Sequence, residues 1–140
     1  MSNIFDAIRN SDTKLIESLA KSNPGLLPEL LREENSEGLQ PLHYAAKWGT
    51  PEIIKLLIHW WADPNGVASS HNRTPLCFVN TLEKAKILIE LGADPSAMVG
   101  PGFNTRPSDW IQNKEILDYL RDVLKEKHLR MELEEKGISG

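Results

Sequence analysis

Cysteine, basic charge and long apolar runs are all scarce in this chain. One cysteine in 140 residues cannot form a disulfide within the chain, which agrees with a reducing compartment and a cytoplasmic location. Acidic residues outnumber basic ones by 20 to 16, so no general attraction to nucleic-acid phosphates is expected. No apolar run approaches the roughly 20 residues that cross a bilayer, and the first residues lack the pattern of a secretory signal. We therefore expect a cytoplasmic protein that binds neither nucleic acid nor membrane.

The residue types that carry catalysis and metal binding are thinly spread. The histidines His43, His59, His71 and His128 are scattered, without a second cysteine or a carboxylate cluster at ligand spacing, which predicts no zinc or iron site. Gly100-Pro101-Gly102 lacks the lysine and the strand-to-helix setting of a phosphate loop. We expect no cofactor, no catalytic residues and no enzyme activity.

An internal repeat is present instead. The segment from Pro41 to Ala46 recurs in weakened form from Thr74 to Val79, with 34 positions between Pro41 and Pro75. The pair Asp63-Pro64 likewise recurs as Asp94-Pro95. A period of this size indicates stacked supersecondary units. The sequence predicts one domain of about four units, near residues 2–34, 35–68, 69–100 and 101–136.

The repeat resembles the ankyrin repeat. That family's pattern is Gly-x-Thr-Pro-Leu-His-x-Ala-Ala, a short helix, Gly, a second helix with Leu-Leu, and Gly-Ala-Asp-x-Asn. The second unit carries Gly38, Pro41-Leu42-His43, Ala45-Ala46, Gly49, Leu56-Leu57 and Ala62-Asp63-Pro64-Asn65; the third carries Thr74-Pro75-Leu76 and Gly92-Ala93-Asp94-Pro95. The resemblance implies an all-α solenoid of helix-turn-helix units with short turn fingers, terminal units that act as caps, and a non-enzymatic role in binding a partner protein.

Two spacings depart from the central period. Ala7 lies 38 positions before Ala45, four more than the central 34, and the surplus falls within residues 26–34. Leucines there predict an amphipathic helical turn or two, which either covers the end of the first unit or contacts a partner. The third unit is three residues short near residues 80–83, so we expect a shortened turn between its helices.

Helix boundaries and the long last helix can also be predicted. Ser2 and either Asp12 or Thr13 are expected to cap the first two helices, and Pro51 suits a first helical turn. Inward positions of the last helix are expected to be Ile116, Leu117, Leu120, Val123, Leu124 and Met131. The charged run from Lys125 to Lys136 is expected to form a solvated cap.

The resemblance places partner contacts on the turn tips and the outer side of the first helices, which line a concave face. The candidates are Glu37, Leu39, Tyr44, Lys47, Trp48, His71, Arg73, Phe103 and Trp110. Tyr, Trp and Arg are enriched among interface hot spots. Tyr44 and Trp110 have the alternative of being partly buried between units.

Trp60-Trp61 is a separate oddity. Trp61 aligns with Gly92, the left-handed residue that ends the second helix in this family, a conformation that suits a bulky aromatic poorly. Part of one ring should be exposed as a second contact or a self-association patch, although we expect a monomer. The sequence also leaves open a stoichiometric inhibitor or immunity-type protein that blocks a partner's active site.

The Thr-His pair of the family motif is split between the central units. In the resemblance, these two side chains hydrogen-bond each other within one unit. The second unit has His43 but Gln40 in the Thr position, and the third has Thr74 but Cys77 in the His position. We expect Gln40→Thr and Cys77→His each to stabilise the protein.

Overall fold

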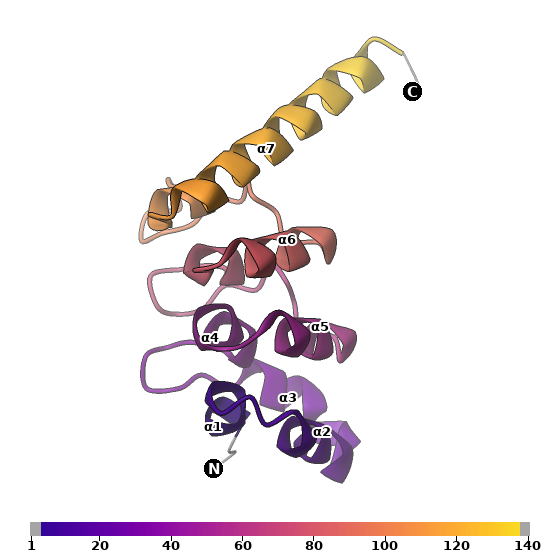
Figure 1. Cartoon of the computed structure of the whole chain (residues 1–140), viewed down its shortest axis with the longest axis vertical. Coiled ribbons are helices and arrows are strands. Elements are labelled where there is room, and N and C mark those ends of the chain that lie inside the picture. Colours follow the sequence, from indigo (N-terminus) through magenta and orange to yellow (C-terminus); the bar gives the residue numbers. More distant parts are fainter. Residues whose placement is uncertain (1–3, 138–140) are drawn as a thin grey trace.

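The computed structural model describes residues 4–137, whose helices stack into one column (Figure 1). In chain order the elements are α1 (Ile4–Arg9), α2 (Thr13–Ser22), the 3-10 turn η1 (Pro24–Leu26), α3 (Leu27–Arg32), α4 (Pro41–Trp48), α5 (Pro51–His59), the 3-10 turn η2 (Pro75–Phe78), α6 (Leu82–Glu90), the 3-10 turn η3 (Pro107–Trp110) and α7 (Lys114–Glu135). The predicted all-α class is confirmed, because the described residues form helices and, apart from two isolated β-bridges, no β-structure. The predicted cap Ser2 lies outside the described residues.

The column has two layers. One layer stacks α1, α4, η2 and η3 in that order, and the other places α5 against α6 and α6 against α7. The buried side chains of both layers join one core, which is built mainly from alanine, leucine and isoleucine. Small residues such as Ala45 and Ala46, both fully buried, let the stacked helices approach closely.

Short fingers project from the layer of first helices. Each of two fingers is closed by an antiparallel bridge, Ala68 with Arg73 and Val99 with Thr105. Neighbouring fingers are joined by main-chain bonds, since the amide of Ser70 donates to the carbonyl of Gly38 over 3.3 Å. These bonds hold the fingers in register along one side of the column, which we call the finger side.

Helix starts follow local sequence signals. Side-chain oxygens of Asp12, Thr50, Thr81 and Asn113 each accept a hydrogen bond from the amide three residues later. Such bonds satisfy amide groups that have no partner within the helix. The predicted capping role of Asp12 and the first-turn position of Pro51 are therefore confirmed.

The surplus segment forms the short helix α3. Leu31 on α3 is buried in the core, whereas Leu26, just before it, is 50% exposed. The predicted amphipathic turn is confirmed, and its buried face covers the core beside α4.

The third unit is shortened within its first helix. The expectation of a shortened turn between its helices is wrong, because three residues (79–81) separate η2 from α6, whereas two (49–50) separate α4 from α5. Where the second unit has the eight-residue helix α4, the third has the four-residue 3-10 turn η2. Two side chains of the third unit donate hydrogen bonds to the last carbonyls of α4. Asn80 donates to the carbonyl of Lys47 over 3.1 Å, and the buried Lys84 donates to that of Ala46 over 3.2 Å. The three missing residues thus remove one turn of helix, and a buried lysine stands next to it.

The last helix, α7, runs past the end of the column (Figure 1). Lys127 still reaches back to the carboxylate of Asp94, 3.1 Å away, but Met131 is 54% exposed. The expectation that Met131 points inward is wrong, because no layer remains for it to pack against at that distance along the helix. Within residues 4–137 no helix combines the length and apolar character that a membrane crossing requires.

Candidate functional site

A hollow of about 380 Å³ opens on the finger side, lined by residues between Glu37 and Asn113. We call it the finger-side hollow. Its walls include Glu37, Leu39, Lys47, Ser70, Arg73, Cys77, Phe78, Val79, Asn80, Trp110, Ile111, Gln112 and Asn113. Five residues predicted for partner contact therefore meet here, from positions up to 73 residues apart in the chain.

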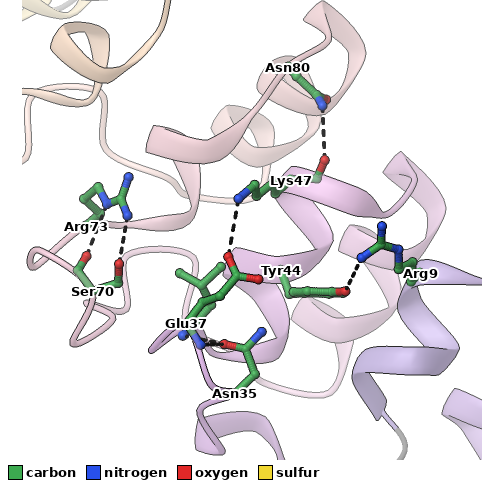
Figure 2. Close-up of polar contacts among 9 residues, drawn as sticks. Arg9, Asn35, Glu37, Tyr44, Lys47, Ser70, Arg73 and Asn80 are labelled. Atoms are coloured by element: carbon green, nitrogen blue, oxygen red, sulfur yellow. Dashed lines mark hydrogen bonds and ion pairs between the residues drawn. The ribbon is translucent and has the colours of Figure 1, made fainter.

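One wall carries an exposed ion pair. The ammonium nitrogen of Lys47 lies 3.4 Å from a carboxylate oxygen of Glu37 (Figure 2). Glu37 is positioned by its own amide, which donates to the side-chain oxygen of Asn35 over 3.0 Å. Because both side chains are well exposed, the pair itself adds little to stability. It does, however, satisfy the carboxylate of Glu37 within the chain.

Arg73, another residue of the walls, lies against two aromatic rings. Its guanidinium carbon is 4.4 Å from the ring centre of Phe78 and 4.9 Å from that of Trp110. The indole nitrogen of Trp110 donates to the hydroxyl of Thr105 over 3.1 Å, which fixes the ring. A cation over aromatic faces is attracted by the negative charge of each ring face. The sequence predicted Arg73 and Trp110 separately, and the structure brings them into contact.

A second aromatic cluster lies on α1 and α4, next to the hollow. The guanidinium of Arg9 lies 4.5 Å from the ring centre of Trp48, and it donates to the hydroxyl of Tyr44 over 3.5 Å (Figure 2). Trp48 remains 43% exposed. Sequence reasoning missed Arg9, since the repeat register aligns it with Lys47 and gives no signal of its contact with Trp48.

Two predicted contact residues are buried. Leu39 is 1% exposed and Tyr44 is 6% exposed. The expectation that Leu39 offers its side chain to a partner is wrong, because that side chain joins the core just before α4 begins. For Tyr44 the alternative of burial between units is the outcome, with its ring against Phe5.

The other predicted residues occupy finger tips. His71 and Phe103 are both exposed and both have left-handed backbones, with φ of 58° and 51°. The imidazole of His71 lies 6.3 Å from the ring of Trp110, centre to centre. His71 therefore extends the aromatic rim of the hollow, whereas Phe103 is not among the residues that line it.

Trp60 and Trp61 end α5 on a different part of the molecule. Trp61 is 90% exposed and has φ of 75°, and its counterpart Gly92 has φ of 111°. The predicted alignment of Trp61 with a left-handed glycine is thus confirmed. Trp60 is half-buried, and with residues of α3 the pair lines a groove of about 450 Å³.

Burial shifts the pKa of three titratable groups in the interior, those of His43, Cys77 and Lys84. Burial lowers the pKa of His43 from 6.5 to about 4, so this imidazole is neutral at pH 7. Burial likewise raises the pKa of the Cys77 thiol and lowers that of Lys84. A buried thiol that stays protonated is a poor nucleophile. Among residues 4–137 no group of three metal-ligating side chains lies together.

Stacked helix pairs joined by fingers on one side define a helical repeat protein. A family model described as "Ankyrin repeats (3 copies)" matches residues 4–98. The chain therefore belongs to the ankyrin repeat family. The match ends before the region of η3 and α7, so the assignment of residues 101–136 to a fourth unit stays a prediction.

Two curated proteins are similar in sequence to about half of the chain. The chain is 36% identical over 72 residues to "Phosphate system positive regulatory protein PHO81" of Saccharomyces cerevisiae, which covers 51% of this chain and 6% of that protein. It is 34% identical over 68 residues to "Nuclear factor NF-kappa-B p100 subunit" of Gallus gallus, which covers 49% and 8% respectively. The chain thus matches less than a tenth of the length of either relative.

Proposed function

We propose that this chain is a non-enzymatic protein-binding module whose partner contacts the finger-side hollow. Ankyrin repeats generally act as protein–protein interaction modules. The observation that carries the proposal is the contact of Arg73 with both Phe78 and Trp110 in the wall of the hollow. Arginine and tryptophan held in fixed positions lose little entropy on binding, which is why such residues dominate interface energies.

The neighbouring cluster extends this surface. Trp48 lies one residue after Lys47, which lines the hollow, and its ring is partly covered by Arg9. A partner that fills the hollow and reaches Trp48 would contact three units at once. Contact across several units is typical of solenoid proteins, whose stacked repeats form an extended binding surface.

Site-specific cross-linking tests the placement. A photoreactive amino acid is introduced at Gln112, an exposed residue of the hollow, or at Lys55, an exposed residue of α5. Each variant is irradiated in lysate of the source organism, and the adducts are identified by mass spectrometry. We expect the same partner to be captured from position 112 and not from position 55. Capture from position 55 alone would contradict the placement.

A double substitution tests the residues themselves. Trp48→Ala combined with Arg73→Ala should weaken binding of the captured partner several-fold, since hot-spot truncations cost above about 1 kcal/mol each. The helical circular dichroism signal should stay unchanged. Equal affinity in a correctly folded double variant would rule out the finger side as the binding surface.

A further inference from the structure

Arg73 is a cation held in place without an acidic partner in the described part of the chain. Its Nε donates to the carbonyl oxygen of Ser70 over 3.2 Å, and its Nη2 donates to the hydroxyl of Ser70 over 2.8 Å (Figure 2). Among residues 4–137 no carboxylate lies within 4.0 Å of its nitrogens, and Nη1 makes no hydrogen bond. One edge of the guanidinium thus keeps donors that this chain does not use.

The charge balance of the hollow is opposite to that of the molecule. The chain as a whole has 20 acidic and 16 basic residues. The walls of the hollow contain two cations, Lys47 and Arg73, and one anion, Glu37. Since Glu37 already pairs with Lys47, Arg73 gives the hollow an uncompensated positive charge.

The surroundings of Arg73 make that charge more effective toward a ligand. The rings of Phe78 and Trp110 both lie against its guanidinium, and a half-buried charge interacts more strongly than one in bulk water. Holding a partly desolvated cation without a counter-ion is costly. A ligand carboxylate would offset this cost, because its two oxygens match the planar fork of an arginine.

We propose that the finger-side hollow binds an acidic peptide segment of a partner protein, with one carboxylate paired to the free edge of Arg73. This inference rests on the proposed function, because it takes the hollow to be the binding surface. The carboxylate belongs either to an aspartate or glutamate side chain or to the end of the partner chain. Both sources present the same pair of oxygens, and experiment separates them.

A random peptide library displayed on phage is the probe. The full chain is immobilised, selected peptides are synthesised with free and with amidated carboxyl ends, and dissociation constants are measured by calorimetry. We expect one acidic position to be enriched, and its replacement by the matching amide to weaken binding about tenfold or more. If amidation of the carboxyl end has that effect instead, the terminal carboxylate is the ligand group.

Variants of the chain identify Arg73 as the receptor. Arg73→Gln should weaken binding by the same factor, and the acid-to-amide change in the peptide should then have no further effect. Arg73→Lys should restore only part of the affinity, since lysine lacks the fork. Arg73→Glu should select basic peptides in place of acidic ones, which a purely structural role of Arg73 would not produce. Arg121→Gln, an exposed arginine on α7, is the matched control and should change nothing.

The outcomes separate this inference from the proposed function. Peptides that lose affinity on Trp110→Ala but tolerate removal of every carboxylate would overturn the acidic ligand and leave the hollow as the binding surface. Peptides indifferent to Trp110→Ala, Arg73→Gln and carboxylate removal would overturn both. If Arg73→Gln loses its helical signal, the acid-to-amide series on the unmodified chain decides the matter.

Discussion

The buried imidazole of His43 has one ring nitrogen near two carbonyl oxygens, and its other ring nitrogen has no hydrogen-bond partner within the described residues. Nε2 of His43 lies 2.9 Å from the carbonyl oxygens of both Gly66 and Arg73, so it must carry the proton. Nδ1 is then an acceptor, and it is buried without a hydrogen-bond partner among residues 4–137. Gln40, which stands where the repeat pattern has threonine, makes no side-chain capping bond at the start of α4.

Gln40→Thr should therefore stabilise the protein. A threonine hydroxyl at this position can donate to Nδ1 of His43, which we expect to add about 1 kcal/mol to the free energy of unfolding. Urea denaturation followed by circular dichroism measures the change. Gln40→Val is the matched control, because it has the shape of threonine without the hydroxyl. Equal stability of the two variants would exclude the hydrogen bond as the cause. For Cys77→His, which the repeat pattern also favours, the gain stays a prediction.

The same imidazole makes stability depend on pH. Its pKa is about 4 in the folded chain and 6.5 as its ordinary value, so the unfolded chain binds a proton more readily between these values. The contribution of His43 is fully present above pH 6.5 and is lost as the pH falls toward 4. The loss amounts to at most about 3 kcal/mol. Denaturation measured from pH 4 to pH 7 should show this slope, and it should persist in His71→Gln but vanish in His43→Gln.

Trp61 combines strain with exposure. A left-handed backbone costs a residue with a side chain roughly 1 kcal/mol relative to glycine, and at 90% exposure the indole recovers little by burial. Trp61→Gly should raise the free energy of unfolding by about 0.5 to 1 kcal/mol and improve solubility. Trp60→Gly is the control, since Trp60 is half-buried and has φ of -89°, and it should destabilise. A fall in melting temperature for Trp61→Gly would show that its ring stabilises the fold by packing in the groove that it lines with residues of α3.

These residue-level outcomes differ in how far the sequence could predict them. The position of Trp61 followed from its alignment with Gly92, because backbone conformation repeats with the unit. The contact of Arg9 with Trp48 could not be predicted this way, since it depends on side-chain directions across two units. The burial of Leu39 was missed for a similar reason: proximity to a finger says nothing about which way one side chain turns.

Among the elements, the end of α4 depends on a neighbouring unit. Lys84 donates to the carbonyl of Ala46 and, over 2.9 Å, to the side-chain oxygen of Asn80. The carboxyl end of a helix carries partial negative charge, which favours a cation there. Helix boundaries at Pro41 and Pro51 could be predicted from local signals. The hydrogen bonds of Lys84 could not, because in the sequence Lys84 is an ordinary polar position on a helix.

Lys84→Met should accordingly destabilise the protein by about 1 to 2 kcal/mol, because it leaves the carbonyl of Ala46 without its donor. The methionine stem keeps most of the packing, so the loss reports the hydrogen bonds. Chemical denaturation at pH 7 measures the difference. Lys55→Met, on the exposed side of α5, is the control and should stay within about 0.5 kcal/mol. No loss at position 84 would mean that relief of the buried charge outweighs the missing bonds.

At the scale of the whole molecule, the repeat period predicted the stacked column, and the positions of its fingers predicted the side on which the hollow lies. The hollow itself could not be predicted, because its walls come from residues far apart in the chain, among them Glu37, Arg73 and Trp110. Residues of the shortened turn η2, Cys77 and Phe78, are also among its walls. A motif search detects what the units share, but the hollow arises from where they differ.

Because the end of α7 extends past the column, backbone amides in two parts of the molecule should exchange with solvent at different rates. The last turns of α7 extend past the column (Figure 1), and Leu129 and Met131 on them are 56% and 54% exposed; a helical end with so little packing opens with little cost. Amide protons from Leu129 onward should therefore exchange with solvent within the time of mixing, whereas those near Ile116 and Leu120, both buried, should exchange only when the column opens. Hydrogen exchange followed by mass spectrometry measures both classes. The circular dichroism of this protein should correspondingly contain a part that melts gradually, and its cooperative transition should account for less than the full helical signal.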